Sequence, residues 1–393
     1  MPSLRAITGE VRGISGASGG AIQNADRRIR HLAEPAVLMG SPARRRQELR
    51  MSRRPTIADV AALAGVSRAT VSFVLNNRPG VAAATQQRVR AAAENLGWTP
   101  SRSARALSTG RAGAVGLVLS REPELIGTDP FYPAFMAGIE SVISDTGDGL
   151  MLHVCRPGDE EATYRRLESD RRVDGVILTD LRVDDPRLAL VAELGLPAVV
   201  VGAVEGGTQL PTVNVDDRPV IRHAVQHLVE LGHRDIAYVA GPEEFVHALR
   251  RRQAWADALA EAGLPVGPVL AGGFTAEGGA RATQALLARS VPPTAIVYGN
   301  DLSATAGIAV AQEAGLRLPE DLSIVGFDDV PLASWTLPSL TTCRANPTSW
   351  GRAAALALVE VIERGDADDV ELDPATLVLR GSTGPAPVRE ASA

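Results

Sequence analysis

Polar side chains follow two apolar runs in the second half of the chain. Asn300 and Asp301 come directly after TAIVYG, and Asp328 and Asp329 come directly after LSIVGF. Short runs rich in valine and isoleucine predict buried parallel strands, and the carboxyl ends of parallel strands meet at one edge of a sheet. Carboxylate and amide groups at that edge hydrogen-bond small polar ligands. We therefore expect a ligand site near these four residues.

Patterns that would support catalysis are weaker. GASGG (Gly16 to Gly20) fits the spacing of a hydrolase nucleophile, but no strand pattern precedes it and no helix pattern follows it. The sequence has no glycine-rich phosphate loop, no metal-ligand spacing and no histidine-centred triad on strand ends. The residues thus predict binding without enzyme activity, cofactor or metal.

The elements that would position the ligand site alternate after Ala112. Apolar runs are separated by helical segments that stop at glycine or proline, which is typical of parallel βαβ units in an α/β body. The runs are GAVGLVLS, GLMLHVC, VDGVILT, PAVVVGA, DIAYVAG, PTAIVYG and LSIVGFDD.

A different pattern occupies the stretch TIADVAALAGVSRATVSFVLNN near the N-terminus. Thr56 with Asp59 predicts the start of a helix, Gly65 predicts its end, and Ser67 is suited to cap a second helix. The short turn holds the second helix at a steep angle to the first. That helix fits the major groove of B-DNA as the second helix of a helix-turn-helix, presenting Arg68, Ala69, Ser72 and Phe73 outward.

A third helical segment, from Ala83 to Leu96, places Val89, Ala92 and Ala93 on one face and completes a small all-α core. The alternative for the first two helices is a hairpin that only packs on its neighbour and leaves Arg68 in solvent.

The charge of the chain is divided unevenly along its length. Residues 51–111 carry nine arginines and two acidic residues, whereas residues 112–393 carry 22 arginines and 40 acidic residues. A basic segment ahead of an acidic body indicates that the first part meets a polyanion.

Neither a membrane span nor a secretory signal is expected. No apolar run reaches the roughly 18 residues needed to cross a bilayer, and the N-terminus lacks the apolar core of a signal peptide. The two cysteines, Cys155 and Cys343, are too few for a disulfide framework, which fits a reducing compartment. The sequence therefore predicts a cytoplasmic protein.

From about Thr56 to about Thr383 the sequence resembles the LacI/GalR family of bacterial transcriptional regulators. The motifs that carry the resemblance are TIADVAALAGVSRATVSFVLN, PSRSARALSTGR, HLVELGHRDIAYVAGP, YGNDLSATAG and VGFDDVPLASWTLPSLTT. The resemblance implies a helix-turn-helix head followed by a periplasmic-binding-protein-like α/β body of two doubly wound subdomains.

The resemblance also implies how the chain binds double-stranded operator DNA. The linker SRSARAL is too short to be helical alone in water, and in the family it forms a hinge helix only on DNA. Two hinge helices then enter the minor groove, where Leu107 wedges a base step; the alternative is that Leu107 packs on the body. The implied DNA contacts are Thr56, Ser67, Arg68, Ala69, Thr70, Ser72, Phe73, Asn76, Arg102, Arg105 and Leu107.

An effector site in the cleft between the two subdomains follows from the same resemblance. The matching residues are Phe131, Tyr132, Arg251, Phe274, Asn300 and Asp328, with Trp335 as a further aromatic residue. An apolar wall with a few polar groups suits a sugar. Two positions depart from the family: Phe73 stands where many members have arginine, and Gly202 stands where many have an acidic or amide group.

The expected organisation begins with a disordered extension at 1–52, a head at 53–100 and a hinge at 101–111. A body at 112–385 and a tail at 386–393 follow. Within the body, the first subdomain takes about 112–213 and 345–372, and the second about 214–344 and 373–385.

The expected function is transcriptional regulation by a homodimeric repressor whose operator affinity responds to a small polar effector. The alternative is a sugar-binding protein or an enzyme on the same two-lobed scaffold.

Overall fold

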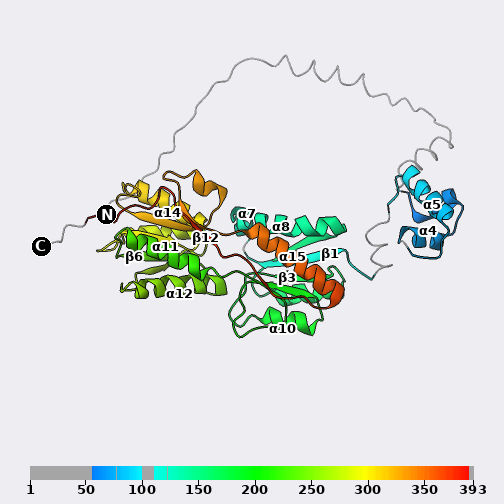
Figure 1. Cartoon of the computed structure of the whole chain (residues 1–393), viewed down its shortest axis with the longest axis horizontal. Coiled ribbons are helices and arrows are strands. Elements are labelled where there is room, and N and C mark those ends of the chain that lie inside the picture. Colours follow the sequence, from blue (N-terminus) through cyan, green and yellow to red (C-terminus); the bar gives the residue numbers. More distant parts are fainter. Residues whose placement is uncertain (1–54, 77, 100–109, 122, 389–393) are drawn as a thin grey trace, which may run out of the picture. The chain divides into compact units, whose positions relative to one another are not determined.

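The computed structural model describes residues 55–76, 78–99, 110–121 and 123–388. Contacts divide the chain at residue 100 into two compact units, here called the head and the body (Figure 1). The expected extension at residues 1–52 and the predicted hinge residues Arg102, Arg105 and Leu107 lie outside the described residues.

The head consists of helices α3 (Ile57–Ala64), α4 (Arg68–Leu75) and α5 (Ala83–Asn95). The Asp59 carboxylate accepts a hydrogen bond from the Thr56 backbone N–H at 2.8 Å, and Gly65 ends α3 with a φ of 66°. Ser67 caps α4 by accepting the Thr70 N–H at 3.1 Å. These start and stop signals confirm the predicted helix-turn-helix, and α4 lies at 100° to α3.

Each helix of the head contributes one fully buried valine to a common core: Val60, Val71 and Val89. No single described helix is long and apolar enough to cross a membrane, although α3 and α4, taken together as a bent pair, reach that length and composition.

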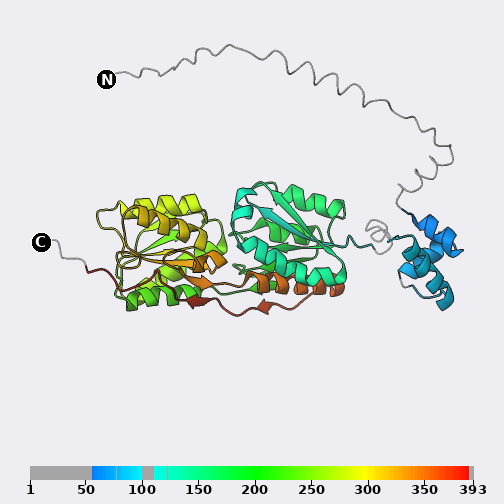
Figure 2. The ribbon, with the colours of Figure 1, turned by 90° about the horizontal axis from the view of Figure 1, so that it is seen from above.

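The first lobe of the body is built on a six-stranded parallel sheet with strand order β11-β5-β4-β3-β1-β2. Its strands are β1 (Ala114–Ser120), β2 (Gly149–Cys155), β3 (Gly175–Leu178), β4 (Ala198–Val201), β5 (Thr212–Asn214) and β11 (Val370–Glu371). One face packs on α8 (Phe131–Thr146) and α15 (Pro347–Arg364), and the other on α9 (Glu160–Ser169) and α10 (Pro186–Glu193) (Figure 2). A short helix, α7 (Pro123–Thr128), precedes α8.

The second lobe repeats this plan with strand order β12-β10-β9-β8-β6-β7. Its strands are β6 (Ile236–Ala240), β7 (Val269–Ala271), β8 (Ala295–Tyr298), β9 (Ser323–Asp328), β10 (Thr341–Arg344) and β12 (Thr376–Val378), of which only β12 runs antiparallel to its neighbour. Helices α11 (Arg218–Glu230) and α12 (Val246–Glu261) cover one face, and α13 (Ala276–Leu287) and α14 (Asp301–Glu313) cover the other.

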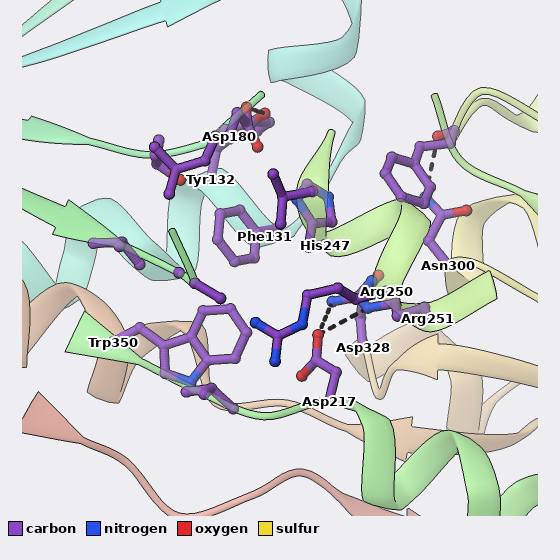
Figure 3. A pocket seen from close by; sticks show the side chains of 18 of the residues that line it. Phe131, Tyr132, Asp180, Asp217, His247, Arg250, Arg251, Asn300, Asp328 and Trp350 are labelled. Atoms are coloured by element: carbon purple, nitrogen blue, oxygen red, sulfur yellow. Dashed lines mark hydrogen bonds and ion pairs between the residues drawn. The ribbon is translucent and has the colours of Figure 1, made fainter. Parts of the chain in front are cut away.

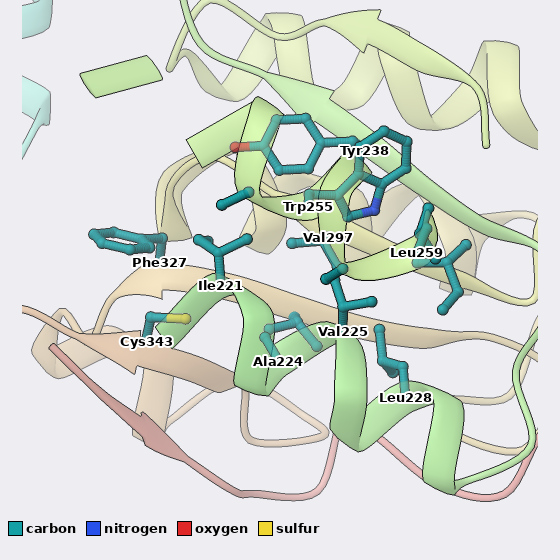
Figure 4. Packing of buried hydrophobic residues seen from close by; sticks show 14 of the residues in the cluster. Ile221, Ala224, Val225, Leu228, Tyr238, Trp255, Leu259, Val297, Phe327 and Cys343 are labelled. Atoms are coloured by element: carbon teal, nitrogen blue, oxygen red, sulfur yellow. The ribbon is translucent and has the colours of Figure 1, made fainter. Parts of the chain in front are cut away.

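A large aromatic pair fills the core between the second sheet and α11 and α12 (Figure 4). The rings of Tyr238 and Trp255 lie 5.4 Å apart and are fully buried, against Ile221, Val225 and Leu228 of α11. Such packing fixes α12, which carries residues of the candidate site.

Within residues 123–388 the chain passes between the two sheets three times, after β5, after β10 and after β11. The helix α15 therefore returns to the first lobe, and β12 returns to the second. An all-α head and an α/β body of two doubly wound sheets confirm the predicted fold class.

Candidate functional site

The outer face of α4 presents side chains that are free of the head's core. Arg68 and Ala69 in its first turn are exposed, and the Phe73 ring is 43% exposed although it is large and apolar. The guanidinium of Arg78 lies 5.8 Å from the centre of that ring, within cation–π range. The head therefore exposes a large apolar ring beside a cation on the outer face of α4.

Polar residues of α4 are arranged by hydrogen bonds within the helix. Ser67 and Thr70 share a hydrogen bond between their hydroxyls at 2.9 Å, and Asn76 donates to the Ser72 hydroxyl at 3.2 Å. Thr56 takes part in the cap of α3. The head thus holds the predicted DNA contacts of this region on or beside a short helix set steeply on its neighbour.

The body contains a cavity at the carboxyl ends of its strands, with an empty volume of about 930 Å³ that includes space open to solvent (Figure 3). Residues of both lobes line it, as the strand order predicts for a doubly wound fold. The polar lining consists of Arg121, Asp129, Tyr132, Thr179, Asp180, Asp217, His247, Arg250, Arg251, Asn300 and Asp328.

On the first-lobe side, Asp180 follows β3 and collects two donors. It accepts the Tyr132 hydroxyl at 2.6 Å and Nε of Arg121 at 3.0 Å. Burial alone would raise the pKa of Asp180, but the charge and hydrogen bond of Arg121 outweigh it and bring that pKa below its usual value. This side of the cavity therefore holds an ionised carboxylate whose charge is compensated.

On the second-lobe side, Arg251 of α12 pairs with Asp217, which lies in the crossing segment after β5. Nε and Nη2 of Arg251 donate to the same oxygen, Oδ2, at 2.8 and 2.6 Å, and Nη1 donates to the Gly299 carbonyl at 3.2 Å. The guanidinium also stacks 3.5 Å from the Phe327 ring centre. Oδ1 of Asp217 is buried and has no hydrogen-bond partner among the described residues.

Asp328, at the end of β9, is a carboxylate of the cavity whose charge is not balanced by hydrogen bonds. None of the hydrogen bonds found among the described residues involves its side chain. Burial and the nearby Asp301 raise the pKa of Asp328 well above its usual value. Its backbone φ of 121° is unfavourable for a residue with a side chain, and such strain concentrates at binding sites.

Asn300 is held in place by the loop that follows β7. Its amide donates to the Phe274 carbonyl at 3.1 Å, and its oxygen caps α14 by accepting the Ser303 N–H at 3.1 Å. Phe274 itself has a φ of 61°, a second strained position on the cavity wall.

Aromatic rings form the apolar part of the wall. Phe131 at the start of α8 meets Trp350 in the first turn of α15, with ring centres 5.7 Å apart and planes at 64°. His247 stacks on Phe274 at 5.7 Å. Burial and the neighbouring Arg251 lower the pKa of His247 to about 3, so its ring is neutral near pH 7.

Six of the seven effector residues expected from the sequence line this cavity: Phe131, Tyr132, Arg251, Phe274, Asn300 and Asp328. The expectation for Trp335 was wrong, because this residue follows a 3₁₀ turn (Pro331–Ser334) that leaves it 83% exposed and outside the cavity lining. Trp350 supplies the tryptophan of the wall instead. Gly202, the second departure from the family, does line the cavity.

Several lining residues were missed by the sequence reasoning. Arg121, Asp180 and Asp217 follow β1, β3 and β5 within a few residues. Arg121 and Asp180 carry the same signal that pointed to Asn300 and Asp328, a polar residue just after an apolar run. Asp217 does not, because the short strand β5 before it has no apolar run.

The cavity offers acceptors, a few fixed donors and aromatic faces, which is the chemistry for binding a small polar molecule with an apolar face. Among the described residues no cluster of His, Cys, Asp or Glu has the arrangement of a metal site.

Comparisons with known proteins find matches to both the head and the body. Residues 56–101 match the family described as bacterial regulatory proteins, lacI family, and residues 225–383 match a periplasmic binding protein-like domain. The HTH-type transcriptional regulator AglR of Rhizobium meliloti (strain 1021) is 36% identical over 341 residues, which cover 85% of this chain and 95% of AglR.

Two solved structures extend the likeness to three dimensions. The transcriptional regulator CelR in complex with cellobiose is 34% identical, with a TM-score of 0.65, over 84% of this chain and all of that chain. The Lac repressor dimer bound to operator and the anti-inducer ONPF is 29% identical, with a TM-score of 0.75 and the same coverage. Because relatives matched over nearly their whole length are regulators and not enzymes, the chain belongs to the LacI family of DNA-binding transcriptional regulators.

Proposed function

We propose that this regulator is a homodimeric cytoplasmic repressor whose affinity for a palindromic operator is set by a sugar bound in the cavity between the lobes. The observation that supports a sugar is that hydrogen-bond acceptors without donors and two aromatic rings line the same cavity. Oδ1 of Asp217 and the carboxylate of Asp328 lack hydrogen-bond donors among the described residues, and Phe131 and Trp350 lie on the same cavity.

A sugar meets these requirements at once. Its hydroxyls donate to the carboxylates, which relieves the cost of burying acceptors without donors. The C–H face of its ring packs on an aromatic side chain. The relative solved with cellobiose supports the same ligand class.

The head and linker provide the operator contacts in this proposal. Arg68 and its neighbours on α4 read the major groove, while Arg102, Arg105 and Leu107 act in the minor groove. The Lac repressor relative, solved as a dimer on its operator, supports a homodimer. The sugar and the operator are then linked: the factor by which sugar changes operator affinity equals the factor by which operator changes sugar affinity.

Sequencing the DNA retained by the purified protein identifies the operator, and a mobility shift with a panel of sugars then tests the response. We expect retention that weakens steeply with salt and changes with one class of sugar. Asp328→Ala should abolish the sugar response and keep operator binding, whereas Leu107→Ala should weaken operator binding and keep sugar binding by calorimetry. A folded dimer that retains no duplex at low salt, or turns over a sugar, would refute the proposal.

A further inference from the structure

The side chain of Asp174 holds the backbone of residues 112–114, which follow the predicted hinge. Asp174 accepts the backbone N–H of Ala112 at 2.7 Å on Oδ1, and those of Gly113 and Ala114 at 2.7 and 3.3 Å on Oδ2. Its side chain is only 9% exposed, and Nε of Arg111 lies 3.9 Å from Oδ2. Three consecutive backbone N–H groups therefore donate to one side-chain carboxylate, an arrangement here called the clamp.

The clamp lies at the root of the linker. The predicted hinge takes residues 101–111, so Ala112 to Ala114 are the first residues that follow it in the chain. A shift of Asp174 therefore shifts the residues that directly follow the predicted hinge.

The same carboxylate is tied to the cavity by a short strand. Asp174 immediately precedes β3, and Thr179 and Asp180, which line the cavity, immediately follow it. Asp180 is bound there by Tyr132 and Arg121. Six residue steps at strand geometry correspond to at most about 20 Å of backbone between Asp174 and Asp180.

Strand β3 has the properties of a rigid connection. All four of its residues are fully buried, and it pairs with β1 on one side and with β4 on the other. A strand held on both edges and packed on both faces shifts as a unit, because the close-packed interior leaves no room for it to bend locally. A ligand that displaces Asp180 displaces Asp174 with it.

We propose that Asp174 is the positioning residue that transmits the state of the cavity to the linker, through β3. This inference rests on the proposed function, since it requires an effector and an operator. Asp174 contacts neither ligand in this scheme and acts only by fixing Ala112, Gly113 and Ala114 to the amino end of β3. A purely structural role, in which the carboxylate only stabilises the start of β1, predicts a different result.

The two roles separate in the ratio of operator affinities with and without effector. Asp174→Asn keeps the size of the side chain, removes its charge and replaces one acceptor by a donor. We expect effector affinity, measured by calorimetry, to stay within about threefold of wild type. The operator ratio, which is the operator affinity with effector divided by that without it, should come to lie within about twofold of one. By reciprocity, effector affinity should then be the same on and off DNA.

Asp148→Asn is the matched control. Asp148 also lies near Arg111, at 4.0 Å from Nη2, but it accepts the Thr146 hydroxyl and none of the N–H groups of residues 112–114. This variant should keep the wild-type operator ratio. If the Asp174→Asn substitution disturbs folding, the milder Asp174→Glu variant, which keeps the charge but displaces the carboxylate, should give an intermediate ratio.

The outcomes are distinct from failure of the proposed function. A wild-type protein that does not respond to any sugar contradicts the proposed function itself. A responsive wild type, together with an Asp174→Asn protein that binds operator more weakly but keeps the wild-type ratio, assigns Asp174 a structural role and overturns this inference.

Discussion

Arg251 gives two hydrogen bonds to one oxygen of Asp217, from Nε at 2.8 Å and from Nη2 at 2.6 Å, and leaves the other oxygen buried. An end-on pair of this kind satisfies the arginine better than the carboxylate. The pair spans from α12 of the second lobe to the segment that links the lobes. The pair therefore ties a cavity residue of the second lobe to the segment that connects the lobes.

Breaking this buried pair from one side should cost more than removing it entirely. Asp217→Ala leaves the buried Arg251 charge without its paired carboxylate, so we expect the free energy of unfolding to fall by about 3–5 kcal/mol. The double variant Asp217→Ala/Arg251→Met should lose less than the single variant. Denaturant titration of the full chain, followed by tryptophan fluorescence, measures both. A single variant as stable as the double one would contradict the pairing.

Removing the charge of Asp328 should stabilise the protein without ligand. Its pKa is raised by burial and by Asp301, whose own pKa burial raises to about 7; the other charged groups acting on Asp328 are Arg251, Asp129 and Asp217. A folded-state pKa above the unfolded value means that the folded protein binds the proton more tightly. Stability from this group is thus full at low pH and is lost as the pH rises through the folded pKa.

Asp328→Asn mimics the protonated acid at every pH. At pH 8 we expect the free energy of unfolding of the variant to exceed that of wild type by about 1 kcal/mol. This difference should vanish toward pH 4. Effector affinity should fall in the same variant. Asp329→Asn is the control, because Asp329 is paired with Arg344 and Arg380 at 2.6 and 2.5 Å and its loss should destabilise. Equal effects of both variants at pH 8 would be inconsistent with an uncompensated Asp328.

Substitutions of Trp335 and Trp350 should affect effector binding differently. Trp350 lines the cavity against Phe131, whereas Trp335 is 83% exposed elsewhere. Trp350→Ala should weaken effector binding about tenfold through lost ring contact, and Trp335→Ala should leave it unchanged. Effector titrations by calorimetry measure both. An effector affinity that is unchanged in Trp350→Ala would argue against a ring contact.

The sequence predicted the fold well where local signals were strong. The expected apolar runs all became strands, and GLMLHVC became β2 with the same bounds. The capping residues Thr56 and Ser67 and the turn glycine Gly65 placed the helices of the head within a residue. These are the positions at which backbone geometry depends on one residue type.

Short edge and linking strands were not predicted. β7, β11 and β12 contain two or three residues each, and β10 reads TTCR, which has no apolar alternation. Such segments become strands because their neighbours in the sheet offer backbone partners, which is a tertiary effect. Trp350 was missed for a related reason: it meets Phe131 across more than 200 residues of sequence, and no spacing in the chain connects them.

The last prediction concerns base recognition by Phe73. Its ring is 43% exposed on the outer face of α4, with the Arg78 guanidinium 5.8 Å from the ring centre. A ring cannot bridge the two acceptors of guanine, but it packs on the C5-methyl group of thymine in the major groove.

Replacing thymine by deoxyuridine removes only that methyl group. At one position in each operator half-site we expect the substitution to weaken binding about fourfold, the value of one buried methyl group. The effect should disappear in Phe73→Ala, and Phe73→Arg should shift the preference at that position toward guanine. Arg78→Ala serves as the control and should weaken binding to thymine and deoxyuridine operators alike. If every thymine tolerates deoxyuridine, or if the loss persists in Phe73→Ala, the ring does not read a methyl group and its exposure on α4 has another cause.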